Sequence, residues 1–293
     1  MERVEVLKTY KVYIGGKFPR TESGRYYTPE NSKGEALGNI CLCSRKDVRN
    51  SVVAARKAFG GWSGRAAFNR GQVIYRIAEM LEGRKSQFVE EIIFQGATKK
   101  KAEQEVDLAI DRLIYYAGWC DKYNQVLGSV NPVASSHFNF SMHEPTGVVG
   151  IIADETTSLI GLVSVIAPVI AGGNTCVVLA SETLPLSAIT FAEVVNSSDV
   201  PGGVINILTG PASETAKPLS THMDVNACVY AGTDTALLTE LQLNAVDNLK
   251  RVRSYSMDWM QPDSQNLYMI ADCQELKTTW HPIENIGGAN STY

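Results

Sequence analysis

The chain has 293 residues, of which 44% are hydrophobic and 20% are charged, a balance typical of a globular protein with one large α/β domain or two smaller ones. Its 27 basic and 31 acidic residues give a net charge of −4, which argues against binding nucleic acid or an anionic membrane through a basic field. The N-terminus is too charged for a secretory signal, and no apolar run approaches the ~20 residues of a membrane span. We therefore expect a cytoplasmic protein.

The cysteines give no sign of a metal centre. They show neither a Cys-x-x-Cys spacing nor a pair of histidines suited to zinc. We predict no metal site, and we expect buried, reduced structural thiols at positions 41, 43, 120, 176, 228 and 273.

Residues 1–126 are predicted to combine an irregular β-rich opening with helices that pack on the domain after them. Short apolar stretches at 10–14 and 37–41 are separated by Gly, Pro, Ser and Asn. Ser44-Arg-Lys-Asp47 has the form of a capping box, and apolar residues then recur at steps of three and four as far as residue 123. Residues 47–123 are therefore predicted to be mostly amphipathic helices.

Residues 127–147 are predicted to form an extended β-hairpin, because two strand-like stretches flank a polar turn. From 148 to 275, apolar runs of strand length alternate with helical segments, which indicates βαβ units and a parallel sheet. The strands are expected at 148–152, 175–179, 204–208 and 227–230, and the helices at about 158–171, 185–196, 212–221 and 234–245.

The last part of the chain is less regular. Residues 251–255 could add a fifth strand to the sheet, and 267–270 a sixth. Residues 276–293 are predicted to be a tail, and the final seven, 287–293, have a tail's composition.

Several segments, in order, resemble the aldehyde dehydrogenase superfamily. Glu144-Pro-Thr-Gly-Val-Val-Gly150 resembles its "EPxGVVG", Ala171-Gly-Gly-Asn-Thr175 resembles the end of its "APAxAxGNT", and the segment from Pro201 to Gly210 resembles its "PxGVxNxxTG". The similarity runs from Ile14 to about residue 275 and corresponds to the N-terminal part of a family member. The chain is similar to the cysteine-less unit of tandem or split members.

This resemblance implies an α/β fold with a Rossmann-like parallel sheet flanked by helices, which is the N-terminal, NAD-binding type of domain in this family. It also implies a protruding β-hairpin at residues 127–147. In the family this hairpin belongs to the oligomerisation region.

The family's catalytic residues are not matched. The segment with the nucleophilic cysteine would lie beyond the end of this chain, and nothing in the sequence lowers the pKa of Cys273. Asp154-Glu-Thr156 replaces the "PWN" that supplies the oxyanion amide, and Tyr255 replaces the glutamate base. Asp154 and Glu155 could be an acid/base pair, although interaction with a helix N-terminus is the favoured interpretation. We therefore predict no catalytic residue.

The cofactor position is also altered. The family uses a lysine after the second strand and a "GSTxxG" turn near the pyrophosphate. Here Ala180 stands in the lysine's place, Leu237 stands in place of the second glycine, and Asp234 would meet a diphosphate with like charge. Glu182 could accept a bond from a ribose hydroxyl or be a solvated loop carboxylate, the favoured interpretation. NAD is the one candidate cofactor, and the resemblance points to Ile152, Glu182, Gly210, Gly232 and Thr233 as the residues that would hold it.

Three hypotheses follow from the sequence. The first is a non-catalytic pseudoenzyme, a structural or regulatory subunit that docks on a complete aldehyde dehydrogenase or on itself, in keeping with a hairpin whose exposed edge needs pairing. The second is an NAD(P)-dependent aldehyde oxidoreductase, completed by a partner chain or by new chemistry at Asp154, Glu155 and Cys273. The third is that the chain is a shortened piece of a longer protein.

Overall fold

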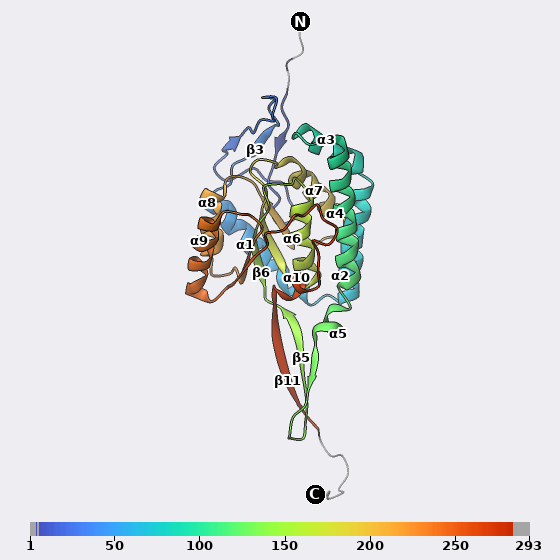
Figure 1. The fold of residues 1–293 in the computed structure, drawn as a ribbon. Helices are drawn as coiled ribbons and strands as arrows, with labels where there is room; N and C mark the ends of the chain where they lie inside the picture. The colour runs from blue at the N-terminus through green and yellow to red at the C-terminus, as the bar shows by residue number, and fades with distance from the viewer. Residues whose placement is uncertain (1–3, 5, 284–293) are drawn as a thin grey trace, which may run out of the picture.

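The centre of the molecule is a five-stranded parallel sheet, seen in the computed structural model, which describes residue 4 and residues 6–283 (Figure 1). Its strands lie in the order β10-β9-β6-β7-β8, and all neighbouring pairs are parallel. The predicted parallel sheet and its fifth strand are therefore confirmed. The strands are β6 (Val148–Ile152), β7 (Thr175–Leu179), β8 (Ile205–Leu208), β9 (Ala227–Tyr230) and β10 (Arg251–Ser254).

Two layers of helices cover the sheet, and a further group packs outside one of them (Figure 1). The covering helices are α6 (Ile160–Ala171) and α7 (Leu186–Asn196) on one face, and α1 (Arg45–Ser63), α8 (Ala212–Ser220) and α9 (Thr235–Ala245) on the other. The outer group is α2 (Ala67–Glu82), α3 (Lys85–Phe94) and α4 (Lys99–Trp119), followed by the short α5 (Tyr123–Leu127). Every residue of α6 is buried because it is enclosed between the sheet and this outer group. In the described part of the chain, no helix has both the length and the apolarity needed to cross a membrane.

The N-terminal opening forms a small sheet that attaches to the edge of the large one. Its strands are β1 (Thr9–Tyr10), β2 (Tyr26–Tyr27) and β3 (Asn39–Cys41). The Tyr13 N–H donates to the Ile207 carbonyl at 2.9 Å, and the Ile207 N–H donates back at 2.8 Å. Strand β8 is thereby paired on its outer edge as well as with β7.

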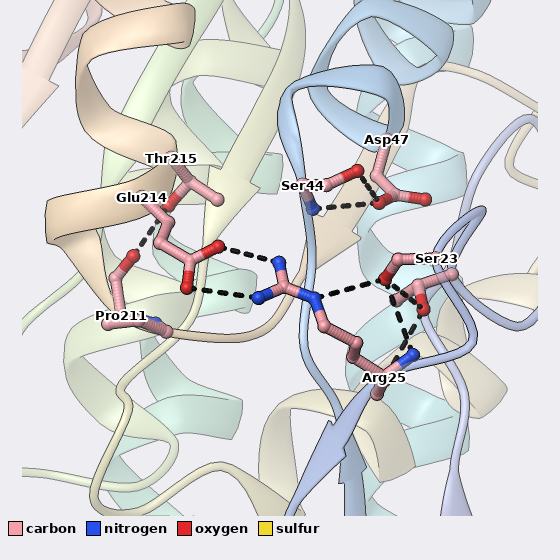
Figure 2. A network of polar contacts seen from close by, with 8 residues as sticks. Ser23, Arg25, Ser44, Asp47, Pro211, Glu214 and Thr215 are labelled. Carbon is pink, nitrogen blue, oxygen red and sulfur yellow. Dashed lines mark hydrogen bonds and ion pairs between the residues drawn. The ribbon is translucent and has the colours of Figure 1, made fainter.

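The predicted capping box at the start of α1 is present and is part of a larger polar network (Figure 2). One carboxylate oxygen of Asp47 accepts bonds from the Ser44 N–H and hydroxyl, both at 2.8 Å. Next to it, Arg25 pairs with Glu214 of α8 at 2.7 Å. The network links the opening, α1 and α8 around one corner of the sheet.

The predicted hairpin at 127–147 is observed as β4 (Ser129–Asn131) and β5 (His137–Pro145), which pair antiparallel and project beyond the helical layers (Figure 1). The prediction of a tail at 276–293 is wrong for residues 276–282. They belong to β11 (Gln274–Pro282), which pairs with β5 over nine positions, because an unpaired β5 edge offers backbone partners to any extended segment beside it. Residues 284–293, including the stretch 287–293 predicted as a tail, lie outside the described residues.

The suggested sixth strand at 267–270 is also wrong. Residues Tyr268–Ala271 form a helical turn, α10, whose buried Met269 and Ile270 contact the same core as α6. A run of four apolar residues does not by its periodicity distinguish a strand from a buried turn of helix. Here packing against α6 decides the conformation.

Candidate functional site

The candidate site is the edge of the parallel sheet where the strands end. Chain order runs outward from β6 through β7 to β8 and then returns to β9 on the other side of β6, so the order reverses next to β6. Ligands of open parallel sheets bind beyond the carboxyl ends of the strands at such a reversal. Ile152 ends β6 between its register partners Leu179 and Tyr230, so it marks the centre of this edge.

The structure brings four of the five predicted cofactor residues to the part of this edge formed by β6, β7 and β9. Buried Ile152 lies in the middle, Glu182 follows β7, and Gly232 and Thr233 form the turn between β9 and α9. Gly210 lies apart from them, because it follows the outer strand β8. It has a φ of +121° and contacts Leu42 and Cys43 of the N-terminal opening. Its glycine requirement therefore comes from that packing.

The N-terminus of α6 is already occupied by a carboxylate of the protein. Glu105 of α4 reaches across, and its Oε1 accepts the backbone N–H groups of Ser158, Leu159 and Ile160 at 2.9, 2.7 and 3.2 Å. Burial raises the pKa of this carboxyl, and the three N–H bonds offset part of that effect. The donors that an anionic ligand would use at this helix are therefore taken.

A second carboxylate occupies the loop after β7. The Glu155 carboxylate accepts the Ser181 hydroxyl at 2.6 Å, the Glu182 N–H at 3.0 Å and the Thr183 N–H at 3.3 Å. Tyr27 of β2 donates its hydroxyl to the Glu182 carbonyl at 3.1 Å. Burial and the nearby Glu155 charge raise the pKa of Glu182. The loop proposed to meet a ribose is thus bound to the protein's own groups.

A third carboxylate caps α9, the helix after the glycine turn. Asp234 accepts the N–H groups of Ala236 at 2.8 Å and Leu237 at 3.2 Å, and it donates its own N–H to the Tyr230 hydroxyl at 2.9 Å. A Cβ at Gly232 would lie 2.6 Å from that hydroxyl, so the tyrosine ring fills the space under the turn. The N-terminus of α9 is therefore also occupied by a carboxylate of the protein.

These contacts test whether NAD fits the edge. A dinucleotide needs backbone donors for its phosphates and a polar or cationic group for its ribose. Here Glu105, Glu155 and Asp234 hold the donors, and β7 ends in the buried, apolar Leu179 and Ala180. Three carboxylates would also repel the two phosphates. The residues present therefore do not fit the cofactor.

The suggested new chemistry at Asp154, Glu155 and Cys273 is excluded by position. Asp154 and Glu155 follow the end of β6, whereas the Cys273 carbonyl accepts bonds from Thr146 and from Asn174, just before β6 and β7 begin. The length of the strand, about 16 Å at ~3.3 Å per residue, separates the two groups. Burial also raises the pKa of Cys273 to about 12, so its thiol stays protonated at neutral pH.

The other altered positions have structural partners. Asp154 accepts the hydroxyls of Thr156 at 2.8 Å and Thr157 at 2.9 Å, so the expected interaction with helix N–H groups is made by Glu105 instead. Tyr255, in the place of the base, donates to Asp272 at 2.8 Å, and burial raises its pKa. Neither residue is placed to act on a substrate.

One pocket opens beside these groups. It has a volume of about 610 Å³, and its lining includes Glu105, Thr156, Thr157, Ser158 and Asp258. The two larger pockets, each about 810 Å³, lie between α1 and α8 and between α2 and α4, away from the carboxyl edge. No three His, Cys, Asp or Glu side chains converge on a metal-sized space anywhere in residues 6–283.

Sequence reasoning missed Glu105. It lies in α4 within the buried stripe formed by Ala102, Val106 and Ala109. A glutamate in an apolar stripe must find partners, since an unpaired buried charge is costly. A glutamate that interrupts an apolar stripe was therefore the sequence signal that could have identified Glu105 as a buried, hydrogen-bonded residue.

Comparison with known proteins shows where these features belong. The family model described as "Aldehyde dehydrogenase family" matches residues 18–254. DhaS of Bacillus subtilis (strain 168), which carries an aldehyde dehydrogenase name, is 33% identical over 249 residues, covering 83% of this chain and 50% of DhaS. Cytosolic 10-formyltetrahydrofolate dehydrogenase of Mus musculus is 30% identical over 93% of this chain and 30% of that protein.

A solved structure is likewise similar to this chain over part of its length. The NAD⁺ complex of an aldehyde dehydrogenase from Bacillus cereus superposes with a TM-score of 0.80 at 25% identity, covering 84% of this chain and 50% of that one. The chain therefore spans half or less of the length of these relatives.

Proposed function

Since the chain belongs to the aldehyde dehydrogenase family, we propose that it is a non-catalytic member, a pseudoenzyme acting as a structural or regulatory subunit. The observation that carries the proposal is the occupation of the carboxyl edge by Glu105, Glu155 and Asp234. Each accepts backbone N–H bonds at a place where the fold presents donors to a ligand. The fold is retained, but the backbone N–H groups that would bind a ligand are hydrogen-bonded to the protein's own carboxylates.

The catalytic positions support the same conclusion. Thr156, Tyr255 and Cys273 provide neither an oxyanion amide nor a free base nor a reactive thiolate. As partners we propose a second copy of this chain or a complete aldehyde dehydrogenase subunit. As compartment we propose the cytoplasm, since all six cysteines are buried as free thiols.

Calorimetric titration of the purified chain with NAD tests the proposal. We expect no binding with a Kd below about 1 mM, which corresponds to about −4 kcal/mol. We also expect no NADH formation when an aldehyde is added. Aldehyde-dependent NADH formation by the purified chain would refute the proposal.

A double variant tests the cause. Glu155→Gln together with Asp234→Ser removes two charges and keeps oxygen acceptors in place, so we expect it to bind NAD more tightly than the unaltered chain. Asp121→Asn is the matched control, because Asp121 is an exposed carboxylate at the end of the outer helices, paired with Lys122. Equal binding by all three proteins would mean that the two charges are not what prevents binding.

The second candidate function is an NAD(P)-dependent aldehyde oxidoreductase completed by a partner chain. It is favoured by one observation, the match to only about half of the B. subtilis and B. cereus proteins. The test is co-purification from the source cell followed by reconstitution. NADH formation that requires both chains, and stops when this one is omitted, would replace the first proposal.

A further inference from the structure

We propose that the groove between α1 and α8 binds an organic polyphosphate, such as a nucleoside triphosphate. The phosphates lie along cationic side chains at the start of α1, and the planar organic part lies against the end of α8. None of the residues predicted to hold NAD lines this groove. The inference therefore goes beyond the non-catalytic role and does not depend on it.

The groove is large and extends along both helices. Its volume is about 810 Å³, within the range of small-molecule sites, about 300–1,000 Å³. At one end, the Leu42 N–H before α1 donates to the Arg25 carbonyl, and Arg25 pairs with Glu214 in the first turn of α8 (Figure 2). At the other end, Arg56 of α1 donates to the Asp224 carbonyl beyond the end of α8. The two helices therefore run side by side in the same direction, and the groove leads from the first turn of α1 to the loop after α8.

The part of the groove beside the start of α1 carries uncompensated positive charge. Four exposed basic side chains line the groove, and no acidic residue does: Arg45, Lys46 and Arg49 of α1 and Lys217 of α8. None of the four forms an ion pair with a carboxylate in the described part of the chain. The acidic residues nearby pair elsewhere, Glu214 with Arg25 at 2.7 Å and Asp224 with Arg56 at 3.9 Å. In a chain with a net charge of −4, this concentration of cations favours an anionic ligand.

Helix stability does not explain these cations. Arg45 and Lys46 are the first two residues of α1, where the positive end of the helix dipole favours acidic side chains. The one acidic residue of this turn, Asp47, is buried and does not line the groove. Its carboxylate accepts the Ser44 N–H at 2.8 Å and the Glu22 N–H at 3.0 Å. Phosphate oxygens, in contrast, are matched by the planar fork of an arginine and by the point charge of a lysine.

The other end of the groove, beyond α8, is uncharged and partly apolar. Pro218, His222 and Met223 line it. The Asp224 N–H donates to Nδ1 of His222 at 3.2 Å, and burial lowers the pKa of this imidazole, so the ring is neutral at pH 7. Met223 is exposed by 68%, and a thioether adapts well to the surface of a ligand. A planar organic group fits this end, which makes an organic polyphosphate a better ligand than an inorganic one.

Calorimetric titration of the full chain with ATP, at low ionic strength and without divalent cations, tests the inference. We expect a Kd of about 0.1 mM or lower and an affinity that falls as salt is added. We expect inorganic triphosphate to bind more weakly than ATP, and adenosine not to bind. NAD is expected to bind more weakly than ATP, because it carries fewer negative charges and its pyridinium ring is positive.

A double variant tests the cationic part of the groove. Arg49→Gln together with Lys217→Gln removes one cation from each helix, and we expect it to weaken ATP binding at least about tenfold. The matched control is Arg20→Gln together with Lys100→Gln. It makes the same change in net charge at exposed residues outside the groove, so we expect its Kd to stay within about twofold of the unaltered chain.

A single variant tests the apolar end. Met223→Ser keeps all four cations, so we expect it to weaken ATP binding and to leave the binding of inorganic triphosphate unchanged. Circular dichroism of each variant checks that the fold is kept.

Three results would overturn the inference. They are no binding of either ATP or inorganic triphosphate, adenosine binding as tight as that of ATP, and an equal loss of affinity in the groove variant and its control. None of these requires NAD to bind, so the groove and the non-catalytic role can fail independently.

Discussion

At the scale of single residues, Glu91 makes stability depend on pH. Its Oε1 accepts the Thr190 hydroxyl at 2.7 Å, while Oε2 is buried without a partner. Burial is the main reason that the pKa of Glu91 is raised above 4.5 in the folded protein. The folded state therefore favours the protonated form, so ionisation costs stability as pH rises from about 4.5 through the raised pKa.

The variant Glu91→Gln removes this ionisation. Relative to the variant, the free energy of unfolding of the unaltered protein is expected to fall across that pH range by about 1.4 kcal/mol for each unit of pKa shift. Above that range we expect the difference to be constant. Urea unfolding at pH 4.5 to 8 measures this. Glu90→Gln, an exposed neighbour, is the control and should show no such change. Parallel pH curves for the two variants would contradict the assignment.

The residue scale also shows what sequence could predict of the site. The losses at Thr156 and Tyr255 were visible as departures from a motif, because each position is fixed by its neighbours in the chain. The partners of Glu105 and Glu155 were not visible. The bonds from Ser158 to Glu105 and from Glu182 to Glu155 join residues 53 and 27 positions apart, and only the packing of α4 and β7 beside α6 brings them together.

At the scale of elements, α6 depends on a cap from another helix. Leu159, in its N-cap position, has no oxygen in its side chain, so Glu105 replaces the usual local cap. In Glu105→Ala three buried N–H groups would lose their acceptor. Bonds to charged groups contribute about 1.5–3 kcal/mol each, and a buried donor without a partner adds a desolvation cost.

We expect Glu105→Ala to lower the free energy of unfolding by at least ~2 kcal/mol in urea at pH 7. The matched control is Glu103→Ala on the same helix, where an exposed pair with Lys99 at 3.8 Å contributes at most about 0.5 kcal/mol. A loss of similar size in both variants would show that Glu105 does not cap α6.

The elements that sequence predicted are those with a buried face. Strands β6 to β9 appear as mainly apolar runs because both of their faces are covered. Helices α6 to α8 lie between them and α9 follows β9, as expected. Strand β11 gave no such signal. Its sequence, Gln-Glu-Leu-Lys-Thr-Thr-Trp-His-Pro, has no continuous apolar run, and from Leu276 to Pro282 its side chains are exposed, so its strand conformation comes from pairing with β5.

At the scale of the whole molecule, the outer helices and the parallel sheet share one core. The largest buried cluster includes Trp62, Ile74 and Leu113 together with Val149 and Ile166. Arg112 of α4 adds polar links, donating to Ser164 of α6 at 2.8 Å and to the Gln261 carbonyl at 3.2 Å. The predicted boundary between residues 1–126 and the parallel region therefore does not separate two cores.

A shared core predicts that both regions unfold together. Trp62 lies on α1 and Trp259 follows β10, and both are buried in the shared cluster. We expect the urea unfolding curve measured by tryptophan fluorescence to coincide with the curve measured by far-UV circular dichroism. In Trp62→Phe, and separately in Trp259→Phe, the two probes are expected to give the same midpoint. If helical dichroism persisted after the fluorescence change was complete, the outer helices would be stable apart from the sheet. Because α4 supplies Glu105 to α6, we expect them to unfold as one unit.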